Sequence, residues 1–285
     1  MSRIDVAKDY SPAEIDRIKA ELWTEVEDGA ETRALDARDA RAELVAEGDS
    51  WFSYPLGFEV LDHLQDLGRY RVRRFAEAGD TLENLTYGTE VRGGWQRRPP
   101  QLDRVLEAIA KTRPRAFLFS GGGNDIAGEE LSAFLNHAGS RLAPLRRSYA
   151  EYAIGTSFRR AYEHLFERVW SVAPSLPIIS HGYAYAIPDG RGYRRLAIRW
   201  SGPWLRPHLV AKGHESVREG RRIIRDLIDL FNEMLQDLSA QHAHFHHVDV
   251  RTVVADGDWE NELHLDGRGF GKVAEAFDRV IQTLP

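Results

Sequence analysis

The sequence contains no cysteine, which excludes disulfide bonds, thiolate metal ligands and a cysteine nucleophile. Lysine is also scarce, with five in the whole chain, and the net charge is -6. A nucleic-acid-binding domain usually needs a strongly basic surface, so no nucleic-acid partner is expected. No run approaches the roughly 18 consecutive apolar residues of a membrane span, so the sequence predicts no membrane-spanning helix.

The amino-terminal nine residues lack the basic and then apolar regions of a secretory signal, so we predict a cytoplasmic location. The 285 residues are 42% hydrophobic and 29% charged. A chain of this size and composition is expected to form a soluble globular protein with one large core. Its oligomeric state is not indicated by the sequence.

The usual nucleotide-binding motifs are missing. The phosphate-binding pattern Gly-x-x-x-x-Gly-Lys-Ser/Thr is absent, and Gly121, Gly123 and Gly128 do not have the dinucleotide spacing Gly-x-Gly-x-x-Gly. No repeat of 20 to 50 residues is present. The sequence therefore predicts no nucleotide cofactor, and no other cofactor is indicated.

Short apolar segments alternate with amphipathic ones along the chain, a pattern that predicts strands separated by helices. The predicted strands are residues 44–46, 70–78, 116–119, 177–179 and 248–250. The predicted helices are residues 58–68, 102–113, 158–169, 216–238 and 270–280. Right-handed crossovers between such strands produce a parallel sheet covered on both faces, so we expect an α/β fold with three layers.

Two further segments define the expected domain organisation. Residues 1–40 are predicted as an N-terminal helical extension that begins at the capping box Ser11-Pro12-Ala13-Glu14, and residues 41–285 as one domain. Helical periodicity fails at about 183–215, which is rich in tyrosine, tryptophan, proline and glycine. Long loops of this kind are usually functional. We interpret this one as an insertion that acts as a lid. Its Trp200 and Trp204, together with Trp51, Phe52 and Tyr54 earlier in the chain, are expected to line an apolar or carbohydrate-binding pocket.

Chemically useful residues follow four of the predicted strands. The segment Gly48-Asp49-Ser50 places a hydroxyl at the start of the next helical region. Gly79 and the Gly-rich segment ending at Asn124 offer amide N–H donors of the kind that stabilise an oxyanion. His264 precedes the last helix and is a candidate general base. Each pattern alone is common in turns, but together they supply the roles needed for acyl transfer.

This ordered set resembles the four signature blocks of the GDSL-type, or SGNH, serine hydrolases, over about residues 42 to 282. The resemblance implies a flavodoxin-like α/β/α domain that cleaves small-molecule esters without a metal, as an esterase or lipase. It implies that Ser50 is the nucleophile and His264 the general base. The oxyanion hole would consist of the Ser50 and Gly79 N–H groups and the Asn124 side chain.

One position departs from the family pattern. Asn261 stands three residues before His264, where the family usually has an aspartate. An amide oxygen can orient the imidazole but stabilises an imidazolium less well than a carboxylate does. We therefore predict Asp258 as the acid of the triad, with Glu262 and Asp266 as alternatives and Asn261 as a residue that orients the histidine.

Three other interpretations remain open. His242, His244 and His246 alternate and would share one face of an extended segment, which suits a zinc-dependent hydrolase, although a polar segment leading into a strand is the simpler interpretation. The missing aspartate also allows a non-catalytic ligand-binding protein on the same fold. A further pattern is a helical stripe of arginines, which is either a solvated face or an anion or partner site: Arg218, Arg221, Arg222 and Arg225.

Overall fold

The computed structural model describes residues 41–54, 58–195 and 198–285. The predicted helical extension over residues 1–40 lies outside this part of the chain. Within it, no helix has the length and apolar character needed to cross a membrane.

A five-stranded sheet forms the centre of the molecule, and all its strand pairs are parallel. Every residue of the central strand β5 is buried, as expected for a sheet covered on both faces. In spatial order the strands are β2 (Tyr70–Arg74), β1 (Ala42–Gly48), β5 (Ala116–Ser120), β6 (Ile178–His181) and β9 (Phe245–Val248).

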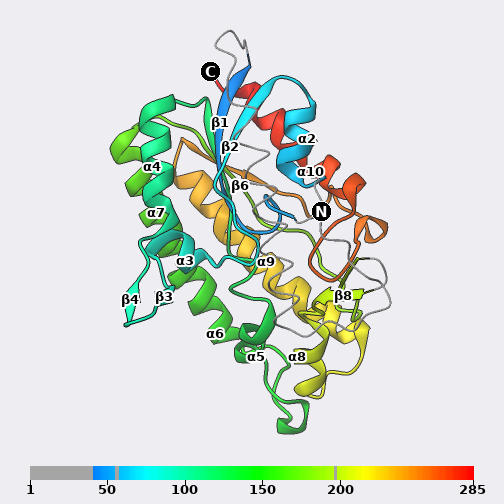
Figure 1. Ribbon diagram of the computed structural model, residues 1–285. Helices are drawn as coiled ribbons and strands as arrows, with labels where there is room; N and C mark the ends of the chain where they lie inside the picture. The colour runs from blue at the N-terminus through cyan, green and yellow to red at the C-terminus, as the bar shows by residue number, and fades with distance from the viewer. Residues whose placement is uncertain (1–40, 55–57, 196–197) are drawn as a thin grey trace.

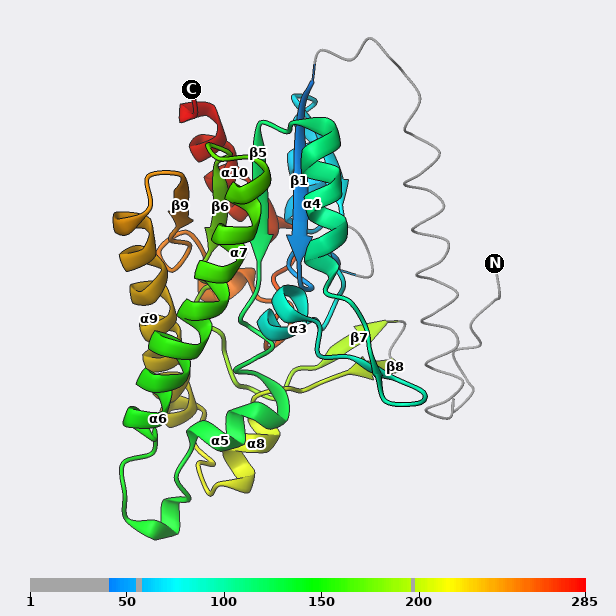
Figure 2. The same ribbon diagram turned by 90° about the vertical axis from the view of Figure 1, so that its left-hand side faces the viewer.

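Helices cover both faces of the sheet, which confirms the predicted three-layer α/β/α class. Helix α2 (Val60–Asp66) and helix α10 (Gly267–Thr283) pack together on one face. On the other face lie α4 (Gln101–Thr112), α7 (Arg159–Val172) and α9 (Val217–Gln241) (Figures 1 and 2). The α9 sequence explains its position, because its apolar residues recur on one side and are buried there.

The strand order creates a natural binding position between β1 and β5. Counted along the chain, the five sheet strands are arranged 2-1-3-4-5, the flavodoxin-like order. The chain leaves β1 toward one edge of the sheet and leaves β5 toward the other, so the two following loops diverge. Ligands of such folds bind in this crevice, beyond the carboxyl ends of the strands.

Two strands have a boundary that differs by three or more residues from the predicted one. Strand β2 ends at Arg74, and residues 75–78 belong to the loop that follows. Strand β9 covers Phe245–Val248, so the predicted strand at 248–250 was placed three residues late. The reason is that His246 and His247 occupy the middle of this edge strand and are only partly buried. They interrupt the apolar pattern by which a strand is recognised.

Shorter elements connect the main ones. Residues 183–215 contain strands β7 (Tyr193–Arg195) and β8 (Ile198–Ser201) and helix α8 (Arg206–Ala211). Before α7, helix α6 (Arg147–Tyr152) continues into a π-helix. The remaining elements are α3 (Leu82–Tyr87), the hairpin β3 (Val91–Arg92) and β4 (Gln96–Arg97), α5 (Leu131–Phe134), the π-helix Ala153–Phe158 and the 3₁₀ turns Gly128–Glu130, Ala138–Ser140 and Asp256–Asp258.

Candidate active site

A tight turn after β1 presents Ser50. Gly48 permits the close approach of β1 to β5, because a Cβ at this position would lie 2.5 Å from the Ser120 carbonyl oxygen. The Asp49 side chain then accepts a hydrogen bond from the Trp51 N–H at 3.0 Å, which closes the turn. The prediction that Ser50 starts a helix is wrong, since α2 begins only at Val60. The turn itself, not a helix end, positions the hydroxyl.

A buried hydrogen-bond network supports this turn from below. Asp49 is 2% exposed and accepts hydrogen bonds from the Ser120 hydroxyl at 2.7 Å and from the Tyr183 hydroxyl. His181 Nδ1 accepts from the Tyr183 N–H, so Nε2 carries the proton and donates to Ser120 Oγ at 2.9 Å. Burial lowers the pKa of His181 to about 3, in keeping with a neutral ring. The network is fully directed and holds the residue next to Ser50 in one orientation.

His264 contacts the Ser50 hydroxyl although 214 positions separate them, with 2.8 Å between Nε2 and Oγ. Its Nδ1 lies 3.0 Å from Asn261 Oδ1. The same amide oxygen accepts the backbone N–H groups of Leu263 and His264, each at 3.0 Å, so the orientation of the amide is defined. Nδ1 must therefore carry the proton. Nε2 is left with a free lone pair that accepts the Ser50 proton, the tautomer that a general base requires.

The imidazole is buried, and its charge state follows from that. His264 is 6% exposed, and burial lowers its pKa to about 3. The resting ring is neutral and ready to accept a proton at neutral pH. Among the described residues no carboxylate contacts the ring, so the imidazolium that would form during proton transfer has only an amide oxygen as its partner.

Asp258 does not take the position that we predicted for it. Its carboxylate accepts two hydrogen bonds from Lys272 Nζ, at 2.7 and 2.8 Å, and one from the Ala255 N–H at 2.8 Å. These contacts direct the Asp258 side chain toward α10, where the ammonium group of Lys272 offsets the cost of burying the carboxylate. The partner of His264 is Asn261, at the position where the family usually has its aspartate.

The two alternative acids also have other partners. Asp266 is the N-cap of α10 and accepts the Gly269 N–H. Glu262 is fully buried and joins the His264 loop to the segment 183–215 through four backbone hydrogen bonds of 2.7 to 3.0 Å. Their donors are the N–H groups of Gly190, Trp204, Leu205 and Arg206. Glu262 thereby fixes Trp204, whose ring is 5.3 Å from that of His264.

The residues predicted for the oxyanion hole come from three neighbouring strand ends. Asn124 Nδ2 donates to the Asp80 carbonyl at 2.7 Å, which leaves its second N–H available. The Glu77 N–H donates to the Gly48 carbonyl at 2.9 Å. Gly79 lies between Glu77 and Asp80, whose backbones are both held by these hydrogen bonds. It has a positive φ of 86° and is exposed. The loop that carries it is therefore attached both to the Ser50 turn and to Asn124.

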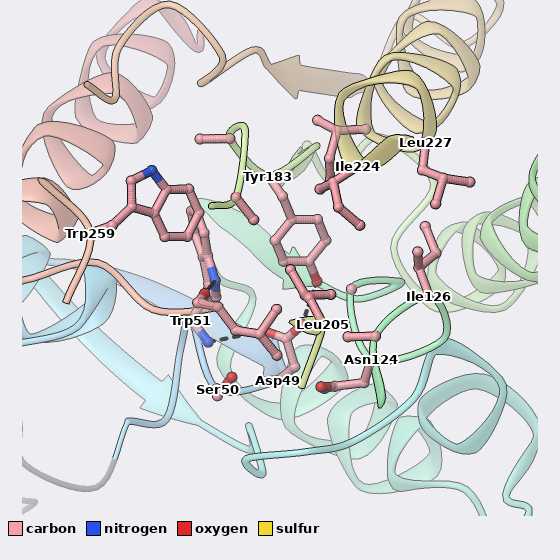
Figure 3. A pocket seen from close by; sticks show the side chains of 16 residues that line it. Asp49, Ser50, Trp51, Asn124, Ile126, Tyr183, Leu205, Ile224, Leu227 and Trp259 are labelled. Atoms are coloured by element: carbon pink, nitrogen blue, oxygen red, sulfur yellow. Dashed lines mark hydrogen bonds between the residues drawn. The ribbon is translucent and has the colours of Figure 1, made fainter. Parts of the chain in front are cut away.

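A largely apolar pocket adjoins Ser50. Its cavity volume is about 50 Å³, and most of its lining is apolar. Figure 3 shows Ser50, Asn124 and Asp49 on one side and Ile224 and Leu227 of α9 on another. The other lining residues are Trp51, Gly123, Ile126, Ala127, Tyr183, Ala184, Ala186, Leu205, Ile228, Trp259 and Leu263.

Sequence reasoning found some residues of this site only in part. Tyr54 was predicted as a pocket aromatic beside the nucleophile, but its stacking on the His264 ring, with centroids 4.4 Å apart, was not. Tyr183, which binds Asp49, was noted only as part of an aromatic-rich loop. Leu205, which lines the pocket, was missed. Nothing in the local sequence indicates Leu205, because Glu262 places it through a contact between distant segments.

The alternating histidines form no metal centre in the part of the chain that the structure describes. No group of three potential His, Asp or Glu ligands is suitably placed there. The His242 ring packs 5.3 Å from that of Phe166 and 5.6 Å from that of Trp170, and His244 also contacts Trp170. These contacts give two of the three histidines a packing role at the end of α9.

Comparison with known proteins identifies structures with a similar fold. No family model and no curated protein matches the sequence. Among solved structures, phospholipase A1 from Streptomyces albidoflavus NA297 has 14% identity and a TM-score of 0.50, covering 84% of this chain and 99% of its own. A protein assigned to the lipolytic G-D-S-L family from Desulfitobacterium hafniense DCB-2 has 14% identity and a TM-score of 0.47 (84% and 99%). A family 3 carbohydrate esterase from Clostridium thermocellum has 12% and 0.47 (86% and 98%).

These identities are too low to transfer an activity. The likeness to the phospholipase A1 covers most of both chains and concerns the fold. The chain thus has the three-layer fold of the SGNH, or GDSL-type, hydrolases, and the resemblance seen in its sequence is confirmed at that level.

Proposed function

We propose that this protein is a serine-dependent carboxylic ester hydrolase of the SGNH type. The observation that carries the proposal is the 2.8 Å contact between Ser50 Oγ and the unprotonated Nε2 of His264. A nucleophile, a base in the correct tautomer and a neighbouring pocket are the minimum set for acyl transfer. The non-catalytic alternative offers no reason for this tautomer to be defined by three hydrogen bonds to Asn261.

The reaction would follow from these contacts. His264 Nε2 takes the Ser50 proton as the hydroxyl oxygen attacks the ester carbonyl. The N–H groups of Ser50, Gly79 and Asn124 stabilise the tetrahedral oxyanion, and the imidazolium returns its proton to the departing alcohol. A water molecule then attacks the acyl-enzyme with His264 as base and releases the acid.

The pocket favours esters with an apolar acyl group. On the side away from Ser50, Figure 3 shows the aliphatic side chains of Ile126, Ile224 and Leu227. Burying apolar surface is favourable by about 25 cal/mol per Å², so the pocket would stabilise a bound acyl chain of several methylene groups. We therefore expect medium-chain esters to be better substrates than acetyl esters or acetylated sugars.

Covalent labelling tests the proposal directly. A fluorophosphonate probe should modify the native protein at one site, and peptide mapping should locate the adduct on Ser50. p-Nitrophenyl acetate, butyrate and octanoate, together with an acetylated sugar, then define the acyl preference. If the folded protein remains unlabelled and cleaves none of these esters, it is a ligand-binding protein on a hydrolase fold.

A further inference from the structure

The hydrogen bonds around His264 continue past Asn261 to a carboxylate. Asn261 Nδ2 donates to the Tyr54 hydroxyl at 3.1 Å, and this hydroxyl donates to Glu260 Oε2, also at 3.1 Å. The direction of every bond is determined, because Asn261 Oδ1 is already occupied by three donors and Nδ2 can only donate. The chain runs His264, Asn261, Tyr54, Glu260 without a break.

The surroundings hold this chain in place. Asn261 is fully buried and Tyr54 is 8% exposed, with its ring stacked on the His264 ring at an interplanar angle of 27°. Glu260 is exposed, but its backbone is fixed by the hydrogen bond from its N–H to the His264 carbonyl. Hydrogen bonds in a buried chain polarise one another, so a charge at one end strengthens the acceptor at the other.

We propose that Glu260, acting through Tyr54 and Asn261, supplies the negative charge that the family's aspartate would place directly beside His264. The proposal rests on the function proposed above. Only the Ser50 proton moves, to Nε2, and no proton travels along the chain. Glu260 and Tyr54 are positioning residues: they orient the Asn261 amide and increase the negative charge on the oxygen that faces the imidazolium.

Two single variants separate charge from packing. Glu260→Gln keeps an acceptor for Tyr54 but removes the charge, and Tyr54→Phe keeps the stacked ring but breaks the chain. Each should lower the fluorophosphonate labelling rate of Ser50 by about fivefold, the scale of a partly solvated charge, and lower the pKa of His264. The control is Glu275→Gln, which removes an exposed carboxylate from α10.

Combining Glu260→Gln with Asn261→Asp gives a result that a purely structural role of Glu260 would not produce. In Asn261→Asp, the Tyr54 hydroxyl can donate to the introduced carboxylate or to Glu260 but not to both, so the two carboxylates compete. Adding Glu260→Gln to this variant should leave the labelling rate unchanged or raise it. An additive fivefold loss in this double variant, or wild-type rates for Glu260→Gln and Tyr54→Phe, overturns the proposal.

A measurement that is independent of catalysis keeps the two proposals apart. NMR titration of the His264 ring reports its pKa whether or not esters are cleaved. A lower His264 pKa in Glu260→Gln supports the hydrogen-bond chain even if the protein proves inactive. An unchanged pKa contradicts the chain even if the wild type is an active esterase.

A second observation, on a separate surface, concerns the arginines of α9. Arg218, Arg221, Arg222 and Arg225 line a groove together with Tyr185, Ala186 and Val217, and no carboxylate is among the lining residues. Within the described part of the chain, Arg218 and Arg222 form no ion pair, whereas Arg221 is held by Asp256 at 2.7 Å. The Arg225 guanidinium lies 4.0 Å above the Tyr185 ring.

This groove adjoins the apolar pocket. Ala186 lines both, and α9 contributes Ile224 and Ile228 to the pocket and Arg222 and Arg225 to the groove. Neighbouring faces of one helix lie within roughly 10 Å, the diameter of a helix with side chains. We infer that the groove binds an anionic group, a carboxylate or phosphate, at the far end of an ester whose apolar part occupies the pocket.

Paired substrates test this inference, which also rests on the proposed function. The mono-p-nitrophenyl ester of suberic acid should exceed p-nitrophenyl octanoate in kcat/KM by about tenfold, and high salt should reduce the difference. Arg218→Gln combined with Arg222→Gln should remove the preference, whereas Arg279→Gln on α10, also exposed, should keep it. Equal use of both esters by the wild type overturns the inference.

Binding of inorganic phosphate tests the groove without hydrolysis. Calorimetric titration of the wild type and of the Arg218 and Arg222 double variant should show a weakening of about tenfold in the variant. If Arg279→Gln weakens phosphate binding equally, the groove is not the site and the inference fails. A protein that binds phosphate in the groove but cleaves no ester contradicts the proposed function only.

Discussion

Replacing Ser50 with alanine is expected to lower kcat/KM for p-nitrophenyl esters by at least about 10⁴-fold, because removal of a catalytic nucleophile leaves only the contributions of binding and the oxyanion hole. Fluorophosphonate labelling should disappear with it. The fold should be unaffected, since His264 is the one hydrogen-bond partner of the Ser50 hydroxyl in the described residues. Steady-state kinetics and urea unfolding of the same preparation measure both effects.

A neighbouring serine provides the matched control. Ser53 is three residues away in the same segment and is half-buried, and its hydroxyl forms no hydrogen bond with any residue that the structure describes. Ser53→Ala should retain both activity and labelling. Residual activity of Ser50→Ala above about one part in a hundred would show that another group is the nucleophile, and the assignment of Ser50 would then fail.

Asn261→Asp is expected to raise kcat by about 10- to 100-fold at pH 8. A carboxylate would replace the amide oxygen 3.0 Å from His264 Nδ1 and stabilise the imidazolium directly, and the reverse change costs about 10⁴-fold in a serine protease triad. The two backbone N–H donors to this position are compatible with a carboxylate oxygen, so the loop conformation should persist. Asparagine and aspartate have the same number of heavy atoms, so the introduced side chain should fit the same space.

The pH profile should move with this change. In the wild type, burial lowers the pKa of His264 to about 3, so the ring stays neutral, and able to act as a base, far into the acid range. The introduced carboxylate should raise this pKa toward the ordinary value of about 6.5, so the variant should lose activity between about pH 7 and pH 5. The kcat profile from about pH 4 to pH 9 measures this.

The same change in pKa should make the activity of Asn261→Asp more sensitive to acid but its folded state less sensitive. A histidine whose folded pKa lies below its unfolded value stabilises the fold above about pH 6.5, and this contribution is lost as the pH falls toward 3. Raising the pKa in Asn261→Asp should therefore make the fold less sensitive to acid. If the variant has the wild-type rate and profile, His264 does not become an imidazolium during catalysis. A rate increase that persists with Ser50→Ala added would come from a contaminant.

The layered α/β fold was accessible from the sequence because each strand and helix has its own pattern of burial. The buried strands β1, β5 and β6 are short apolar segments, and α9 and α10 show their apolar faces at helical spacing. The edge strand β9 was misplaced because its polar histidines conceal this pattern. The hairpin β7–β8 was missed because strands of three and four residues are too short to show a clear alternating pattern.

The choice of acid shows where sequence reasoning fails. Asp258 is as close to His264 in sequence as a loop partner needs to be, yet its carboxylate turns to Lys272. Which of several nearby carboxylates reaches an imidazole depends on side-chain direction and on competing hydrogen-bond donors. These competitors come from α10 and from the segment 183–215, neither of which can be placed by spacing along the chain.

The amino-acid sequence was enough to predict the alternation of strands and helices and the chemical groups at the strand ends. It also showed that no aspartate stands three residues before His264. Each of these depends on residue type and on periodicity, which are local properties. The contacts of Ser50 with His264, of His264 with Asn261, and of Tyr54 with Asn261 and Glu260 could be seen only in the folded chain. A hydrogen bond requires two groups within about 3 Å and correctly directed, and packing between segments some 200 residues apart determines that geometry.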